Sequence, residues 1–259
     1  WCSNYCSLAT QNCTGANQLY DTEDQCITAC NSFAADADAG AVDGDSVQCR
    51  IYHLGVAGSG GEEAAATHCP HGSESGAGIC APQPTCEDLC DLLETNCTGE
   101  FAQYANTGSC LATCSNDLGW DSGLIIDTSG NTVGCRMYHA TVAGTDGDTS
   151  AAAHCGHAGP TGGGVCGSYC DVYCDASNRN CKADNALYAS DDQCQSACGG
   201  LLTMGSALAT DGDSLQCRLY HLGVAGSDPA STAANHCPHG GLQGGGVCVD
   251  ETPTCTAYC

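Results

Sequence analysis

The sequence has very few basic residues. Lysine and arginine together number 5, against 30 aspartates and glutamates, so the formal net charge is −25 at pH 7. Binding to nucleic-acid phosphates or to anionic lipid depends on lysine and arginine. We therefore expect no nucleic-acid partner.

Long hydrophobic runs and large apolar side chains are also scarce. No apolar run approaches the roughly 18–20 residues that span a bilayer, so we expect no membrane insertion. Two phenylalanines, two tryptophans and two methionines are present, beside 35 glycines. One large apolar core is therefore not expected, whereas small units held by cross-links are.

Cysteine, by contrast, is abundant. The chain contains 26 cysteines in 259 residues, a content typical of disulfide scaffolds, which persist in oxidising compartments. The sequence begins at Trp1 and shows no signal peptide, as expected of a mature or excerpted secreted product. We predict a secreted protein, located extracellularly or at the cell surface.

The cysteines follow a repeated pattern. Each repeat has the spacing C-x3-C-x6-C-x12-C-x3-C, then 18 or 20 residues, then C-x19-C-x10-C. The first cysteines fall at positions 2, 86, 170 and 255, which gives a period of about 84 residues. The pattern predicts repeats at 1–84, 85–168 and 169–253, followed by a stub at 254–259 that starts a fourth repeat or forms a cap.

Each repeat is predicted to be a small, disulfide-rich, mainly α-helical unit. Cysteines four positions apart lie one turn apart on one helix face, so two antiparallel helices with a C-x3-C pair each would form a cross-linked hairpin. The expected disulfide cysteines of the three hairpins are Cys2, Cys6, Cys26, Cys30, Cys86, Cys90, Cys110, Cys114, Cys170, Cys174, Cys194 and Cys198. The four other cysteines of each repeat allow three connectivities, among which the sequence does not choose.

Two further helices and a loop are expected in each repeat. A third helix is expected to begin near Ser46, Thr132 or Ser214 and to carry a CRxYH motif. A short fourth helix carries an HCxH motif and is expected to stop where Pro70 or Pro238 intervenes. A glycine-rich loop follows it.

All nine histidines lie in these two motifs. One follows the cysteine of CRxYH by one helical turn, and the two of HCxH are three residues apart, so they project to one side of a helix end. The three triads are His53, His68 and His71; His139, His154 and His157; and His221, His236 and His239. A disulfide from Cys49 to Cys69 would bring the first triad together directly.

Three imidazoles on a cross-linked frame suit Cu or Zn with an open fourth position. The acidic chain attracts cations, and protonation of the imidazoles near pH 6 would weaken binding. We predict one ion per repeat and three per chain. The structural alternative is that duplication copied histidines that cap helix carbonyls or fill partly buried positions.

Arg50, Arg136 and Arg218 occupy the same position beside the three triads. We expect each to pair with a nearby acid such as Asp45 or Asp213. The functional alternative is a ligand carboxylate such as a haem propionate.

Haem is the alternative cofactor. CRxYH resembles the C-x-x-C-H attachment motif of c-type cytochromes with tyrosine in place of the second cysteine, and two histidines would then be axial ligands. Those tyrosines, Tyr52, Tyr138 and Tyr220, are interpreted as core aromatics with a hydrated hydroxyl, or as aromatics beside a redox site.

Two further motifs carry weaker signals. The DGD motif occurs at 43–45, 146–148 and 211–213. Such oxygen-rich turns can hold Ca²⁺, but no complete calcium-binding loop is present in the sequence. We therefore expect solvated turns at these positions. NCT sequons make Asn12 and Asn96 glycosylation candidates; the alternative is an asparagine that ends a helix.

The pattern C-x3-C, CRxYH, HCxH and a glycine-rich loop before a last cysteine resembles cysteine-rich tandem repeats in predicted secreted proteins of myxobacteria and related environmental bacteria. The resemblance covers the whole chain. It implies location, with no established activity and no catalytic residue.

We therefore expect an extracellular structural repeat protein, forming filaments by head-to-tail self-association, with a His-ligated Cu or Zn in each repeat. The alternative function is extracellular electron transfer through regularly spaced copper or haem centres. An enzyme is not expected, because no acid or base partner stands beside the triads in sequence.

Overall fold

The computed structural model describes residues 1–118, 120–199, 204–227 and 231–249. These residues form helices joined by loops and contain no β-strand beyond two isolated bridges. The fold is therefore the mainly α-helical, disulfide-rich one that the sequence predicts. None of the described helices is long and apolar enough to cross a membrane.

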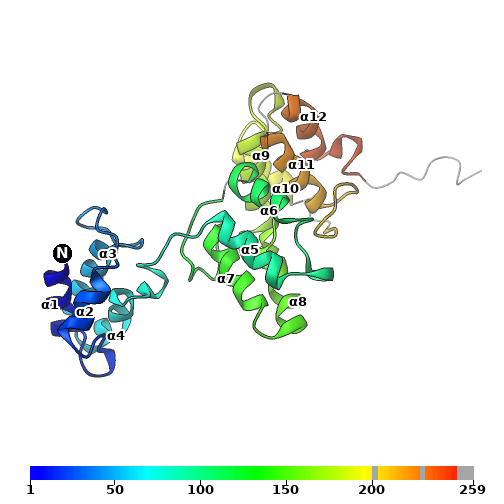
Figure 1. Ribbon diagram of the computed structural model, residues 1–259. Coiled ribbons are helices and arrows are strands. Elements are labelled where there is room, and N and C mark those ends of the chain that lie inside the picture. Colours follow the sequence, from blue (N-terminus) through cyan, green and yellow to red (C-terminus); the bar gives the residue numbers. More distant parts are fainter. Residues whose placement is uncertain (119, 200–203, 228–230, 250–259) are drawn as a thin grey trace, which may run out of the picture. The chain divides into compact units, whose positions relative to one another are not determined.

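Each repeat contributes four α-helices in the same order (Figure 1). Repeat 1 has α1 (Cys2–Asn12), α2 (Glu23–Cys30), α3 (Val47–Ala57) and α4 (Gly61–Gly72). Repeat 2 has α5 (Cys86–Asn96), α6 (Thr107–Ala112), α7 (Val133–Ala143) and α8 (Gly147–Ala158). Repeat 3 has α9 (Tyr169–Asn180), α10 (Asp191–Cys198), α11 (Leu215–Ser227) and α12 (Ser231–Gly240). The short helical turns are η1 (Gly15–Asn17), η2 (Gly76–Gly78), η3 (Gly99–Phe101), η4 (Thr113–Asp117), η5 (Gly162–Gly164), η6 (Ala183–Asn185) and η7 (Gly244–Gly246).

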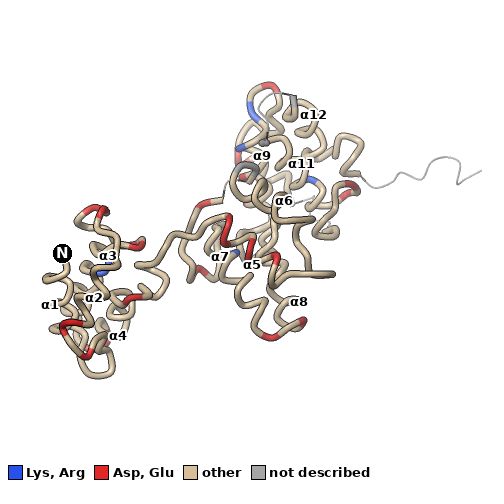
Figure 2. Tube along the Cα trace, viewed as in Figure 1, with Lys and Arg blue, Asp and Glu red and all other residues tan. Residues whose placement is uncertain are grey.

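The chain divides into two compact units. Unit 1 is Trp1–Gln83 together with Leu124–Ile126, and unit 2 is Pro84–Gly123 and Asp127–Cys259. In unit 2, repeats 2 and 3 share one cluster of buried side chains, and α11 packs against η4. Aspartate and glutamate positions are distributed along the chain in both units (Figure 2).

The third helix of each repeat begins where the sequence predicts, directly after a residue that caps it. The Ser46 hydroxyl accepts a hydrogen bond from the Cys49 amide at 3.1 Å, and Thr132 and Ser214 cap α7 and α11 in the same way. In α2, Thr22 and Gln25 form the expected capping box. Local sequence therefore determines where these helices start.

Four disulfides cross-link each repeat. In repeat 1 the hairpin of α1 and α2 is held by Cys2–Cys30 and Cys6–Cys26. The other two bonds are Cys13–Cys69, from the end of α1 to α4, and Cys49–Cys80, from α3 to the loop after η2. Repeats 2 and 3 have the same connectivity. The Cys49–Cys69 pairing considered above is thus wrong, and α4 is bonded to α1 instead.

The helices that carry HCxH do not stop at proline. Helix α4 continues through Pro70 to Gly72, and α12 continues through Pro238. The expectation of an earlier end was wrong because a proline in the last turn removes only one backbone hydrogen bond. That turn is also held from outside by the Cys13–Cys69 disulfide.

Paired differences in residue size between the repeats show that the third and fourth helices pack in the same way in each repeat. A Cβ atom on Gly72 would lie 2.4 Å from Leu54, so the bulky leucine requires a glycine opposite it. Repeat 2 has Ala140 and Ala158 at these positions, and both are buried. In repeat 2 the smaller side chain on the third helix is thus matched by a larger residue on the fourth helix, as close packing requires.

A buried arginine ties the start of α3 to the loop after α4. Arg50 is 1 % exposed and pairs with Asp45 at 2.8 Å. It also donates hydrogen bonds to the carbonyls of Ser46, Ser73 and Glu74. The expected pairing with a nearby acid is confirmed here and at Arg218 with Asp213.

Repeat 2 keeps the arginine but not the acid. Arg136 donates to the side-chain oxygen of Asn131 at 2.9 Å and to the carbonyls of Thr132 and Gly159. Its guanidinium stacks over the Trp120 ring at 3.6 Å. Burial lowers the pKa of Arg136 to about 9, which leaves it charged at neutral pH.

We predict that Arg50→Met destabilises the protein by about 2–3 kcal/mol, because buried carbonyl acceptors lose their donor. Guanidinium chloride unfolding followed by circular dichroism measures the change. The matched control is Arg179→Met, which removes an exposed arginine and should leave stability nearly unchanged. Equal stabilities of the two variants would contradict the structural role of the buried guanidinium.

Candidate metal centre

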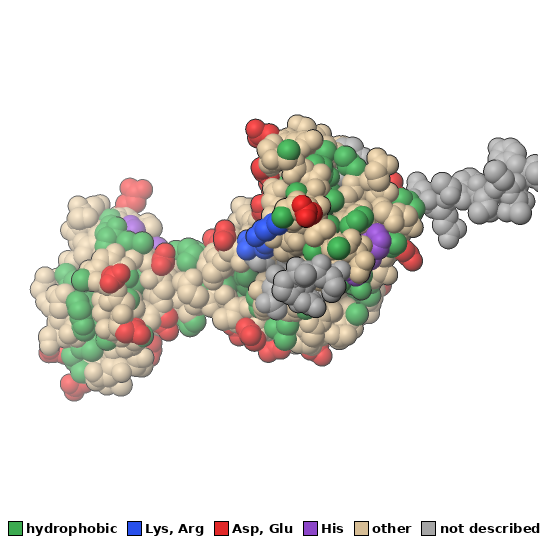
Figure 3. Space-filling model, turned by 90° about the horizontal axis from the view of Figure 1, so that it is seen from above, with side chains coloured by type: hydrophobic (Ala, Val, Ile, Leu, Met, Phe, Trp, Pro, Cys, Tyr) green, Lys and Arg blue, Asp and Glu red, His purple; other side chains and the backbone are tan. Residues whose placement is uncertain are grey.

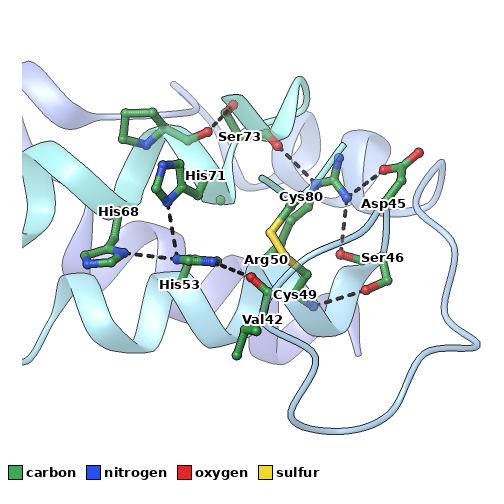
Figure 4. The surroundings of a disulfide bond; sticks show 12 residues. Val42, Asp45, Ser46, Cys49, Arg50, His53, His68, His71, Ser73 and Cys80 are labelled. Atoms are coloured by element: carbon green, nitrogen blue, oxygen red, sulfur yellow. Dashed lines mark hydrogen bonds and ion pairs between the residues drawn. A yellow bond between two sulfur atoms is a disulfide. The ribbon is translucent and has the colours of Figure 1, made fainter. Parts of the chain in front are cut away.

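The three histidines of each triad meet where the third helix crosses the end of the fourth. In repeat 1, α3 supplies His53, and the last turn of α4 supplies His68 and His71 (Figure 4). His53 is 7 % exposed, whereas His68 and His71 are partly exposed. Histidine side chains accordingly reach the molecular surface (Figure 3). The sequence prediction that the imidazoles converge is therefore met by the geometry.

The convergence involves one particular ring nitrogen of each histidine. The Nδ1 atom of His53 lies 3.0 Å from Nδ1 of His68 and 3.3 Å from Nδ1 of His71. The His53 and His68 rings are stacked with an interplanar angle of 23°, and His71 stands nearly perpendicular to both. Three nitrogens thus face a common point.

The same arrangement recurs in the other repeats. The Nδ1 atom of His139 lies 2.8 Å from that of His154 and 3.4 Å from that of His157. In repeat 3 the His221 to His236 distance is 2.8 Å. The ring angles in both repeats follow those of repeat 1. The geometry is thus a property of the repeat.

A backbone carbonyl sets the tautomer of the first histidine. The Nε2 atom of His53 lies 2.9 Å from the carbonyl oxygen of Val42, so Nε2 carries the proton and donates it. Thr128 and Thr210 provide the equivalent carbonyls for His139 and His221. The Nδ1 atom of the first histidine therefore points a lone pair into the centre of the triad.

The sequence analysis did not identify these carbonyls. The available signal was their spacing: each lies eleven residues before the first histidine, in a loop whose residue types differ between repeats. Because a main-chain acceptor leaves no side-chain signature, only the constant spacing could have indicated it.

Burial favours the neutral form of the triads. The pKa of His53 is lowered by desolvation, an effect opposed by the bond to Val42 and reinforced by His68. Desolvation and then the two neighbouring imidazoles lower the pKa of His71. The pKa is also lowered, mainly by desolvation, for His139, His157, His221 and His239. Neutral imidazoles with free lone pairs are the form that binds metals.

The nitrogen positions match those around a tetrahedral ion. With metal–nitrogen bonds of 2.0–2.1 Å, neighbouring ligand nitrogens lie about 3.3 Å apart. The measured separations of 2.8–3.4 Å are close to this value. The triads of repeats 1 and 2 each form a group that can hold a metal ion. A fourth position would remain for a solvent molecule or another ligand.

Cysteine sulfur does not belong to this donor set. Cys49 and Cys80 also lie near His53. They are bonded to each other, so neither offers a thiolate. The equivalent cysteines of repeats 2 and 3 are bonded too. The ligand set is therefore imidazole alone.

The same disulfides remove the basis for the haem alternative. Cys49, Cys135 and Cys217 would each have to supply the thioether of an attached haem, but their sulfurs are in disulfides. The arginines proposed to bind its propionates, Arg50 and Arg218, are buried and pair with their own aspartates. Haem attachment at these motifs is therefore wrong for this structure.

The glycine-rich loop closes over the third histidine. A Cβ atom on Gly163 would lie 2.6 Å from Cδ2 of His157, and one on Gly245 equally close to His239. Both glycines have positive φ angles. Repeat 1 has Ala77 at this position with φ of 44°, a conformation that favours glycine. The loop thus limits how the third imidazole can turn.

The remaining sequence candidates lie outside the triads. Asp45 and Asp213, from two of the DGD turns, pair with arginines, and calcium binding there stays a prediction. Asn12 ends α1 and donates its side-chain amide to the Leu54 carbonyl, as Asn96 does to Ala140. Glycosylation at either amide, also still a prediction, would attach a sugar to the nitrogen that donates this bond.

The stub at 254–259 lies outside the described residues. Its two cysteines and its proposed roles as a cap or as the start of a fourth repeat remain predictions.

Comparison with known proteins agrees with the repeat pattern. A family model described as the BfoA family C-terminal domain matches residues 1–83, 81–171 and 167–251. No curated protein and no solved structure matches the chain. The three matches follow one another along nearly the whole sequence and coincide with the cysteine repeats. The chain is a cysteine-rich tandem-repeat protein and belongs to the BfoA family, with three copies of its C-terminal domain.

Proposed function

We propose that this chain is an extracellular structural repeat protein in which each repeat binds one Cu or Zn ion through its histidine triad. The observation that carries the proposal is the meeting of three Nδ1 atoms in repeats 1 and 2, and of the first two in repeat 3, with the lone pair of the first one fixed toward the others. The metal would join the end of the fourth helix to the third helix.

The hydrogen-bonding capacity of the triad supports a cation. A neutral imidazole has one donor and one acceptor. Because Nε2 of His53 is the donor to Val42, its Nδ1 can only accept, and two neighbouring Nδ1 atoms compete for that one lone pair. In repeat 3 the Nδ1 atom of His239 is inaccessible and has no hydrogen-bond partner. A bound ion would satisfy all three nitrogens at once.

The covalent framework supports an extracellular location. All cysteines of the described part of the chain are in its 12 disulfides. Disulfides of this density persist in oxidising environments, and each typically contributes about 2–4 kcal/mol by restricting the unfolded chain. The protein is therefore suited to an oxidising environment, in which its disulfides are not reduced.

Packing between repeats supports self-association into filaments. Within unit 2, Leu219 of α11 is buried in the core shared with repeat 2. Repeat 1 has Ile51 at this position, where it is only partly buried. We propose that repeats of successive molecules pack head to tail as repeats 2 and 3 do.

The first test is metal stoichiometry. We predict that His53→Ala lowers the number of Cu²⁺ or Zn²⁺ ions bound per chain by one, because two imidazoles alone hold an ion weakly. Isothermal titration and native mass spectrometry count the ions. Glu63→Gln is the matched control: it removes an exposed charge from α4 and should leave the count unchanged. A wild-type protein that binds no ion at neutral pH would refute the proposal.

Elemental analysis with a visible spectrum of the purified sample identifies the natural metal.

The second test is pH. Because burial lowers the pKa of the first and third histidines of each triad from 6.5, the unfolded chain binds protons at a higher pH than the folded chain does. We predict that stability of the metal-free protein is full above pH 6.5 and falls as the pH drops below it toward the lowered pKa values. Thermal unfolding from pH 8 to pH 5 measures this. All nine histidines of the chain belong to triads, so replacing one triad by glutamines should flatten the profile. An unchanged profile would contradict the prediction.

A further inference from the structure

A tyrosine lies beside the first histidine of every triad. The ring centroids of Tyr52 and His53 are 5.2 Å apart, and the rings are perpendicular. Tyr138 with His139 and Tyr220 with His221 repeat this edge contact at 5.2 Å and 5.1 Å. An ion on Nδ1 of the histidine would therefore be separated from a phenol ring by one imidazole ring.

Two of these tyrosines are exposed, contrary to the interpretation of them as core aromatics. Tyr52 is 44 % and Tyr220 is 48 % exposed, whereas Tyr138 is partly buried. Their hydroxyl groups donate to no residue in the described part of the structure. Neither apolar packing nor hydrogen bonding therefore accounts for the exposed part of these two phenol side chains.

Other tyrosines have evident structural roles. The hydroxyl groups of Tyr5 and Tyr20 are hydrogen-bonded at 2.7 Å, and Tyr5 also donates to the Gly72 carbonyl. Tyr173 and Tyr188 form the same pair in repeat 3. These pairs join the loop before the second helix and the end of the fourth helix to the first helix. Their phenols face the interior, and they serve as an internal comparison for the exposed tyrosines.

We propose that Tyr52 and Tyr220 are sites of copper-dependent oxidative cross-linking between copies of this protein. The inference rests on the proposed triads and on their binding of copper. Copper supports one-electron chemistry, and a readily oxidised phenol ring contacts the first ligand histidine in each repeat. Exposure then allows two such phenols of different molecules to meet.

The reaction consumes one hydrogen peroxide molecule as oxidant for each cross-link. Copper in the triad passes one electron from each phenol to peroxide, and each phenol also loses its hydroxyl proton. Two tyrosyl radicals form one carbon–carbon bond between their ortho positions, and the rings regain aromaticity by moving their ortho hydrogens to oxygen. The two electrons and two protons convert peroxide into two water molecules, and copper returns to its starting state.

Disulfides cannot supply this cross-link within the described residues, because every cysteine there is already paired inside its own repeat. A tyrosine cross-link would add a covalent bond between molecules without disturbing that pairing.

The test loads the full chain with one Cu²⁺ per triad, confirms binding by titration, and then adds hydrogen peroxide. We expect dityrosine fluorescence and covalent dimers on reducing gels, with peptide mapping placing the bond at Tyr52 and Tyr220. Zn²⁺-loaded and metal-free samples should give neither signal. The double variant Tyr52→Phe, Tyr220→Phe should lose both signals while binding copper as before. The matched variant Tyr20→Phe, Tyr188→Phe should retain them.

Several results would overturn the inference. Bound copper without cross-linking refutes it and leaves the metal-site proposal intact. Cross-linking that survives the Tyr52→Phe, Tyr220→Phe change refutes the assigned sites, and oxygen addition to monomers in place of dimers refutes the coupling step. Absence of copper binding before peroxide is added refutes the proposed metal site and this inference together.

Discussion

The buried guanidinium at the start of the third helix is the interaction on which the histidine site depends. Arg50 holds the carbonyls of Ser73 and Glu74, which follow the last turn of α4, and the carbonyl of Ser46 at the start of α3. The Cys49–Cys80 disulfide joins the same two segments covalently. Together they set how the start of α3 meets the end of α4. His53 lies one turn further along α3, and His68 and His71 lie near the end of α4. Unpaired, such a charge would be costly to bury, and the three carbonyls and the Asp45 carboxylate compensate it here.

The three repeats show which parts of this arrangement tolerate change. Repeat 2 replaces the acidic partner of the arginine by Asn131, and Trp120 stacks on the guanidinium where Phe33 does so in repeat 1. It also has Leu89 where the other repeats have a buried tyrosine, and the Tyr104 hydroxyl is left without a partner. The nitrogen geometry of the triad is nevertheless the same. The side chains packed around the site thus differ between the repeats, whereas the relative placement of the two helices that carry the histidines is the same.

Much of the fold was predictable from the sequence, because cysteine spacing and capping residues act locally. The hairpin of α1 and α2, the start of α3 at Ser46 and the convergence of the histidines all follow from such signals. The continuation of α4 through Pro70 did not, since tertiary restraints on its last turn outweigh the local preference. The pairing of Cys13 with Cys69 depends on how α1 packs against α4, which no local pattern encodes.

Cys69 stands between the two histidines of the α4 motif and is bonded to Cys13. In the newly made, reduced chain this cysteine is a thiolate donor adjacent to two imidazoles, and thiolates bind soft cations strongly. Oxidation withdraws that sulfur and leaves nitrogen ligands alone. For any metal ion that these residues bind, the order of oxidation and binding would therefore decide the ligand set: a reduced chain offers sulfur and nitrogen, and an oxidised chain offers nitrogen alone.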